Sequence, residues 1–374
     1  MREILLEKNG DIYSMAYLID GELYEYGIWG EDNSPKVNSI YLAKVMRNMP
    51  SINACFVSLR NDTQGFLPHN EIPQKVNTGD FIIVQVKRPA EGDKAAYVSG
   101  DIAFVGKYII YLPYSEKGGV SSKIDDREER NKLHNIARGI EVEQGAFVMR
   151  SISCNADSSD IISEAENLIS KWNELYNNAQ NMSVEGIIKA APDALEAFLR
   201  DNPYNIDSFI SNIEGAGEKY GIPCKLSENP MRLRAVPDKL SKALRRRIHL
   251  KSGANICIDP CEAMTVIDVN SAKSKKGAGL STNIEAAREV ARLIRLRKIS
   301  GIIMVDFIDM TSNQEKDILL EEMKKALSED SVKTDVLGFT RLGIMEITRK
   351  RSNTALANDR NICPYCKGSG IYEQ

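Results

Sequence analysis

The most informative parts of this 374-residue sequence are two apolar runs, Ala263-Met-Thr-Val-Ile-Asp-Val-Asn-Ser271 and Ile302-Ile-Met-Val-Asp-Phe-Ile-Asp-Met310. Each run is typical of a buried strand, and Asp268 and Asp306 stand near their ends. The apolar spacing between the runs predicts an amphipathic helix over residues 283–298. A strand–helix–strand crossover makes the two strands parallel neighbours. We therefore expect Asp268 and Asp306 to project from one carboxyl edge of an α/β sheet.

Two neighbouring carboxylates suit a divalent cation, because the cation offsets their repulsion. Mg²⁺ typically binds one or two carboxylates, several waters and substrate phosphate oxygens. Asn270 lies on the same strand face as Asp268 and could orient a phosphate or a water without adding negative charge. Alternatively, Asp268 and Asp306 are strand-end carboxylates satisfied by backbone donors or by neighbouring arginines.

The whole chain divides into segments that differ in predicted secondary structure. A hairpin with an Asp-Gly turn is predicted within residues 1–36, and residues 37–113 contain about five short strands that fit a small closed barrel. Residues 114–224 are mixed, with predicted helices. Residues 225–360 alternate strands and helices, which favours an α/β layer. Residues 361–374 contain a Cys-Pro-Tyr-Cys knuckle.

The barrel block carries two phenylalanines that the strand alternation places outside. Side chains alternate between the faces of a strand, so Cys55 and Val57 are expected inside and Phe56 outside. Phe66 lies in the following strand. With Lys94 nearby, this pair would offer bases a stacking platform and phosphates a cation. Alternatively, Phe56 and Phe66 are ordinary packing residues.

Composition limits the classes of protein to which the chain can belong. There are 49 Lys plus Arg against 52 Asp plus Glu, and the net charge is −3, so affinity for a polyanion must be local. Local basic clusters exist: residues 232–251 hold eight Lys or Arg against one Asp, and others lie at residues 292–298 and 349–351. Solvated helix faces are the alternative explanation. Seven cysteines, no apolar run of membrane-spanning length and a charged N-terminus predict a cytoplasmic protein without membrane insertion.

The knuckle has the spacing of half a zinc site. Cys363 and Cys366 would supply two of four tetrahedral ligands, and the sequence contains no second Cys-x-x-Cys. A symmetric homodimer sharing one Zn²⁺ supplies the missing pair. Alternatively, the two cysteines are a redox pair or free thiols.

Taken together, these motifs resemble the ribonuclease E/G family. The resemblance rests on Val266-Ile-Asp-Val-Asn-Ser271, Thr282-Asn-Ile-Glu-Ala-Ala287, Gly301-Ile-Ile-Met-Val-Asp-Phe-Ile-Asp-Met310, Glu346-Ile-Thr-Arg-Lys-Arg351 and Cys363-Pro-Tyr-Cys366. It implies an α+β, multi-subdomain fold. In it, an RNase H-like scaffold begins in residues 1–36 and is interrupted by an S1-like OB barrel in residues 37–113. A 5′-sensor region with the rest of the scaffold (114–224), a DNase I-like catalytic subdomain (225–360) and a zinc link (361–374) follow.

The resemblance also implies an activity and a set of site residues. The activity is Mg²⁺-dependent endonucleolytic cleavage of single-stranded RNA, leaving a 5′-phosphate and a 3′-hydroxyl, with no organic cofactor. The implied residues are the catalytic and Mg²⁺-binding Asp268 and Asp306, the adjacent Asn270, the RNA-contacting Phe56, Phe66 and Lys94, the 5′-phosphate sensor Arg150, Ser151 and Lys333, and the zinc ligands Cys363 and Cys366.

This sequence departs from the family pattern at the sensor and near its end. Ser122 and Lys333 stand where the resemblance implies arginines, and neither side chain can form a planar fork to phosphate oxygens, so weakened 5′-monophosphate sensing is expected. The sequence ends soon after Cys366, which favours a dimer over a tetramer. The competing hypothesis is a non-catalytic RNA-binding module of a ribosome or RNA-decay assembly, which would leave Asp268 and Asp306 without a role.

Overall fold

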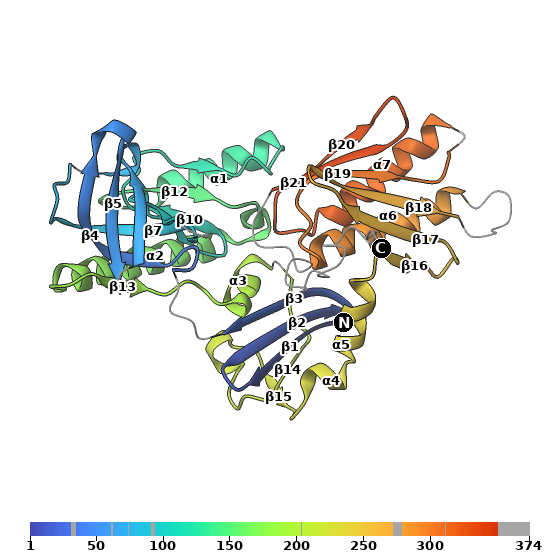
Figure 1. The fold of residues 1–374 in the computed structure, drawn as a ribbon, viewed down its shortest axis with the longest axis horizontal. Coiled ribbons are helices and arrows are strands. Elements are labelled where there is room, and N and C mark those ends of the chain that lie inside the picture. The colour runs from blue at the N-terminus through green and yellow to red at the C-terminus, as the bar shows by residue number, and fades with distance from the viewer. Residues whose placement is uncertain are drawn as a thin grey trace, which may run out of the picture. The chain divides into compact units, whose positions relative to one another are not determined.

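The computed structural model describes residues 1–30, 35–60, 63–73, 75–90, 94–202, 204–271, 279–310 and 312–350. The chain forms two compact units (Figure 1). Unit 1 combines Met1–Gly30 with Tyr204–Gln374, and unit 2 is Glu31–Pro203. Unit 2 is therefore an insertion in the sequence of unit 1. The predicted mixed α+β architecture is confirmed.

Unit 2 begins with a closed five-stranded barrel. Its strands are β4 (Ile40–Met49), β5 (Ala54–Arg60), β6 (Thr63–Pro68), β7 (Phe81–Arg88) and β8 (Ala96–Ser99). They pair in the order β4-β5-β6-β8-β7, and β7 pairs back to β4. The short helices η1 (Pro50–Ile52) and η2 (His69–Glu71) follow β4 and β6. Alternate side chains fill the interior, including the fully buried Cys55, Val57 and Leu59, so the predicted barrel is confirmed.

The remainder of unit 2, as far as the structure describes it, is a small sheet with three α-helices and one short 3-10 helix. Strands β9 (Phe104–Val105), β10 (Ile109–Leu112), β11 (Gly119–Val120) and β12 (Ala146–Met149) pair in the order β11-β12-β10-β9. β9 and β10 fall within residues 37–113 but lie outside the barrel, whereas β13 (Gly186–Lys189) pairs with β4. The helices are α1 (Arg127–Gly139), η3 (Ser151–Asn155), α2 (Ser158–Gln180) and α3 (Ala194–Asp201).

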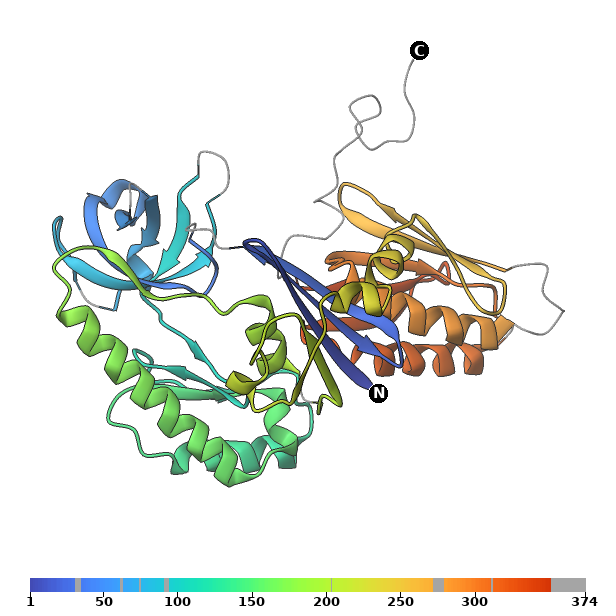
Figure 2. The same ribbon diagram turned by 90° about the horizontal axis from the view of Figure 1, so that it is seen from below.

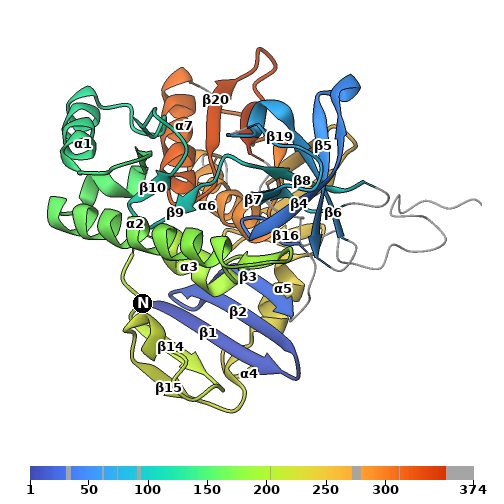
Figure 3. The same cartoon turned by 90° about the vertical axis from the view of Figure 1, so that its left-hand side faces the viewer.

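Unit 1 contains a five-stranded sheet to which both of its sequence segments contribute strands. The strands are β1 (Arg2–Asn9), β2 (Ile12–Ile19), β3 (Glu22–Gly30), β14 (Ser208–Ser211) and β15 (Cys224–Leu226). Their order is β15-β14-β1-β2-β3 (Figure 3), and η4 (Glu218–Tyr220) precedes β15. The predicted hairpin turn is confirmed, because Asp20 and Gly21 between β2 and β3 have φ of 49° and 79°, as a tight hairpin turn requires.

The second sheet of unit 1 carries the two decisive sequence runs. Its strands are β16 (Arg247–His249), β17 (Asn255–Pro260), β18 (Met264–Asn270), β19 (Gly301–Asp306), β20 (Thr334–Phe339) and β21 (Met345–Arg349). They pair in the order β16-β17-β18-β19-β21-β20. The helices of this region are α4 (Pro230–Leu233), α5 (Val236–Ala243), α6 (Gly279–Leu296) and α7 (Asn313–Leu327). β18 and β19 are parallel, as the predicted crossover through α6 requires.

Helices α6 and α7 cover one face of this sheet (Figure 2). Ile267 and Val305 on that face are fully buried, whereas the alternate residues Val266 and Asp268 are exposed. One face of the sheet thus carries the core and the other carries Asp268.

Candidate active site

Asp268 and Asp306 occupy opposite positions on neighbouring parallel strands. The register of β18 and β19 pairs Asp268 with Asp306, and adjacent strands lie about 4.8 Å apart. Both residues are exposed and on the face that α6 and α7 do not cover. As predicted, Asp268 and Asp306 are neighbours near the carboxyl ends of their strands, and they lie on one face of the sheet.

Asn270 supports one of these carboxylates directly. Its side-chain Nδ2 donates a hydrogen bond of 2.6 Å to Asp268 Oδ2. The bond holds that carboxylate on the open face and adds no negative charge. Asn270 therefore belongs to the same cluster as the carboxylates.

The surroundings of Asp306 disfavour the ionised form of its carboxyl group. Desolvation raises the pKa of Asp306 above its ordinary value, and the nearby carboxylates of Asp268 and Asp309 raise it further. A bound cation would oppose these effects, because it stabilises the ionised carboxylates. Hard oxygen donors of this kind suit Mg²⁺.

The described residues supply a partial metal-ligand set at this position. Within the part of the chain that the structure describes, three or more His, Cys, Asp or Glu side chains nowhere gather as a metal-binding group. Two carboxylates are nevertheless compatible with Mg²⁺, which usually retains several waters. The residues present therefore fit a magnesium ion that completes its shell with water and phosphate oxygens.

A buried amide that the sequence patterns did not single out holds the segment after β19. Asn283 of α6 is fully buried. Its Nδ2 donates to the Ile308 carbonyl at 2.8 Å, and its Oδ1 accepts from the Ile308 amide at 3.1 Å. The two bonds fix the backbone between Asp306 and Asp309. The predicted helix began at Asn283, where asparagine is ordinary, whereas α6 begins at Gly279 and places Asn283 inside the helix, where asparagine is unfavourable unless its side chain is bonded.

The outer face of the barrel carries the predicted aromatic pair. Phe56 and Phe66 are half-buried, and their ring centroids lie 5.7 Å apart with an interplanar angle of 72°. The register of β5 and β6 places them opposite each other. Lys94 is exposed and lies two residues before β8. The geometry provides outward aromatic surface with a cation in the adjoining segment.

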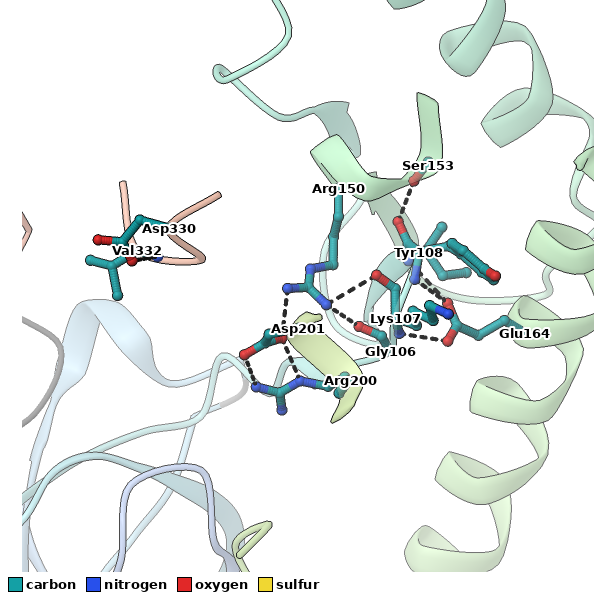
Figure 4. Close-up of polar contacts among 11 residues, drawn as sticks. Gly106, Lys107, Tyr108, Arg150, Ser153, Glu164, Arg200, Asp201, Asp330 and Val332 are labelled. Carbon is teal, nitrogen blue, oxygen red and sulfur yellow. Dashed lines mark hydrogen bonds and ion pairs between the residues drawn. The ribbon is translucent and has the colours of Figure 1, made fainter. Parts of the chain in front are cut away.

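Arg150 is already engaged by neighbours within unit 2 (Figure 4). One terminal nitrogen donates to the carbonyls of Gly106 and Lys107 at 2.5 and 3.0 Å, and the other pairs with Asp201 Oδ1 at 2.7 Å. Asp201 also receives two hydrogen bonds from Arg200. Burial acts to raise the pKa of Asp201, but the two arginines outweigh it and lower that pKa overall.

The other sensor candidates lie on exposed positions. Ser151 begins η3 directly after Arg150, and Ser122 lies in the turn before α1. Lys333 belongs to unit 1, and its Nζ lies 3.6 Å from Asp335 Oδ2. No planar fork for a phosphate is formed by Ser122 or Lys333, as the sequence indicated.

The predicted basic cluster at residues 292–298 does not form a polyanion-binding surface. Arg292 pairs with Glu289 and donates to the Leu23 carbonyl. Arg295 pairs with Glu25, and the buried Arg297 donates to the carbonyls of Ala243 and Arg245. Interpreting these arginines as an RNA footprint was wrong, because their guanidinium groups tie structural elements of unit 1 together.

The cluster at residues 232–251 is more accessible. Arg245 and Arg247 are exposed, while Arg246 pairs with Asp259. This region retains cationic surface beside the sheet that carries Asp268.

The predicted zinc ligands Cys363 and Cys366 lie outside the described residues. In the described ranges, no helix has both the length and the apolar character needed to cross a membrane.

Comparison with known proteins adds independent information. A sequence model of the Ribonuclease E/G family matches residues 103–352. The chain is 30% identical to ribonuclease G of Escherichia coli K12, over 98% of this chain and 84% of that protein. It is 28% identical to ribonuclease G of Haemophilus influenzae, over 98% of this chain and 83% of that protein. Against ribonuclease E of Escherichia coli K12 the identity is 26%, over 99% of this chain and 39% of that longer protein.

Proposed function

The chain belongs to the ribonuclease E/G family, and we propose that it is an endoribonuclease that cleaves single-stranded RNA with the help of Mg²⁺. Its products would be a 5′-phosphate and a 3′-hydroxyl. The observation that carries the proposal is the pairing of Asp268 with Asp306 on the open face of the second sheet of unit 1. A module that only binds RNA has no need for two adjacent carboxylates, which repel the phosphate backbone.

Asp268 and Asp306 would hold the metal ion. A bound divalent cation polarises a phosphate oxygen and lowers the pKa of a coordinated water. Asn270 keeps the Asp268 carboxylate on the open face through its 2.6 Å hydrogen bond. Asn283 fixes the backbone that follows Asp306. The reacting phosphate would therefore meet carboxylates whose positions are set before substrate binds.

The barrel would select unpaired RNA. Phe56 and Phe66 present aromatic surface to bases, and Lys94 would contact the backbone. A duplex hides the faces of its bases, so such a platform favours single strands.

Dependence on a 5′-monophosphate is expected to be weak. Arg150 already pairs with the Asp201 carboxylate, and Ser122 and Lys333 replace the arginines that the family pattern implies. Preference for a 5′-monophosphate would rest on Ser151 and on whatever part of Arg150 a phosphate can reach.

A zinc-linked homodimer is part of the proposal. Its support is the Cys363-x-x-Cys366 spacing, which supplies half of a tetrahedral site. Zinc content and molar mass in solution should both fall when both cysteines are replaced by serine. Unchanged mass in the zinc-depleted variant would exclude the shared ion as the link.

Cleavage of labelled single-stranded RNA tests the catalytic proposal. Mg²⁺ should support cleavage, EDTA should abolish it, and Asp306→Asn should lower the rate by at least about 1,000-fold because it removes a metal ligand. Binding of the same RNA in EDTA should be nearly unchanged in the variant. Asp317→Asn, an exposed carboxylate on α7, is the matched control and should cleave normally. Full cleavage by Asp306→Asn would remove the metal from the mechanism and favour a different site.

A further inference from the structure

The aromatic pair on the barrel is part of a longer row. The β5–β6 register pairs Phe56 with Phe66, and the β6–β8 register pairs Phe66 with Tyr97. The Phe66 and Tyr97 ring centroids lie 6.1 Å apart with an interplanar angle of 39°. Like both phenylalanines, Tyr97 is half-buried. We call Phe56, Phe66 and Tyr97 the aromatic row.

An arginine lies on the last ring of this row. The β7–β8 register pairs Tyr97 with Arg88, and the Arg88 guanidinium carbon lies 4.5 Å from the Tyr97 ring centroid. Arg88 is exposed. At the other end, Arg47 of β4 is exposed and opposite Phe56. The row therefore crosses three strands and ends in a cation on each side.

A hydrogen bond to Glu71 fixes the orientation of the Tyr97 side chain. Its hydroxyl donates to Glu71 Oε1, and this bond raises the pKa of Tyr97 above its ordinary value. The Glu71 carboxylate is thereby engaged by the phenol. A side chain held at its ring by Arg88 and at its hydroxyl by Glu71 loses little freedom when a ligand stacks on it.

We propose that Tyr97 and Arg88 form a third nucleotide subsite, in which an unpaired base stacks on the Arg88 guanidinium held over the Tyr97 ring. The inference rests on the proposed RNA binding by Phe56 and Phe66. Arginine planes and aromatic rings both stack on bases, and neither needs a particular base. The N–H groups of the Arg88 guanidinium would then donate hydrogen bonds to the adjoining phosphate. The ligand is thus a run of three nucleotides of single-stranded RNA, bound without regard to sequence.

Ordinary packing would account for Tyr97 equally well if only its burial were considered. Packing does not explain why the guanidinium of an exposed arginine lies 4.5 Å from the ring centroid at the end of a row of outward aromatic side chains. The subsite also predicts a dependence on RNA length that packing does not. Affinity should increase when the third nucleotide is added and should gain less from further nucleotides.

Fluorescence anisotropy with labelled oligouridylates of two, three, four and ten nucleotides tests the subsite. Measurements in EDTA keep the RNA intact. Removing one stacking contact should weaken binding of the ten-nucleotide RNA by about 5- to 150-fold in Tyr97→Leu. The affinity gain between two and three nucleotides should disappear in this variant. Arg88→Gln should reproduce much of the loss, and because Arg88 is exposed this variant is expected to fold normally.

Two further variants separate the possible failures. Phe81→Leu alters an exposed phenylalanine of β7 outside the row and should bind RNA like the unmodified protein. Phe56→Ala should weaken binding at every length. If Phe56→Ala weakens binding but Tyr97→Leu and Arg88→Gln do not, the third subsite is refuted and the proposed function stands. If Phe56→Ala also binds normally, RNA binding by the barrel is itself refuted.

Discussion

Replacing Arg349 with methionine should destabilise unit 1 without affecting RNA binding. Arg349 ends β21, and its side chain and that of Asp330 are each only 3% exposed. The Arg349 Nε and Nη2 donate to Asp330 at 2.7 and 3.2 Å, and Nη1 donates to the Ile299 carbonyl at 3.1 Å. Methionine retains much of the volume but leaves the Asp330 carboxylate buried without its cation.

The expected loss is about 3–5 kcal/mol, because breaking a buried ion pair from one side leaves an uncompensated charge. Part of the charge of Asp330 remains solvated by the Val332 amide, which donates to it at 3.0 Å. For a unit of this size a loss of 1 kcal/mol lowers the melting temperature by about 2–4 °C. The melting temperature of unit 1 should therefore fall by roughly 6–20 °C.

Denaturant unfolding and calorimetry of the full chain measure this loss. Lys350→Met, at the exposed neighbouring position, is the matched control and should change stability by less than about 0.5 kcal/mol. Adding Asp330→Asn to Arg349→Met should recover part of the stability, since the buried charge is then removed. If Arg349→Met left the melting temperature unchanged and weakened RNA binding, the structural role assigned to Arg349 would be refuted.

The remaining predictions concern the candidate site. The raised pKa of Asp306 means that its carboxyl remains protonated to higher pH than an ordinary aspartate, so Mg²⁺ affinity measured by calorimetry should fall as pH decreases toward that pKa. Asp268→Asn should move this fall to lower pH, and an unchanged profile would contradict the coupling. Asn283→Ala should reduce the cleavage rate by about 10- to 100-fold, because it frees the backbone after Asp306. RNA affinity measured in EDTA should change little. An equal loss of affinity and rate would indicate general unfolding. Asp201→Asn should increase the ratio of cleavage rates for 5′-monophosphorylated and 5′-hydroxyl RNA, because it weakens the pairing that engages Arg150; an unchanged ratio would exclude Arg150 as a phosphate contact.

The alternation of inward and outward side chains along strands, and the strand–helix–strand order, were predictable from the sequence because both leave a pattern in neighbouring residues. The alternation around Phe56 and the crossover between β18 and β19 are local patterns, and both are present in the structure. The crossover makes β18 and β19 parallel neighbours, and the register that pairs Asp268 with Asp306 is supplied by the structure. Asn283 was missed because its partners, the backbone groups of Ile308, lie 25 residues away and leave no periodic signal.

The basic residues show most clearly which features of the site cannot be predicted from a segment of sequence alone. A sequence gives the number of cations in a segment but not the direction of each guanidinium. Three arginines of the 292–298 cluster form hydrogen bonds or ion pairs with carboxylates and carbonyls of distant elements: Arg292, Arg295 and Arg297. Adjacent positions can thus have opposite roles: Arg349 lies in the core with Asp330, whereas Lys350 is exposed. The motif Thr348-Arg-Lys350 therefore combines an internal ion pair, made by Arg349, with a surface cation, Lys350. Replacing Arg349 and Lys350 together would mix an effect on stability with an effect on RNA binding. The two single variants, measured side by side, separate these effects.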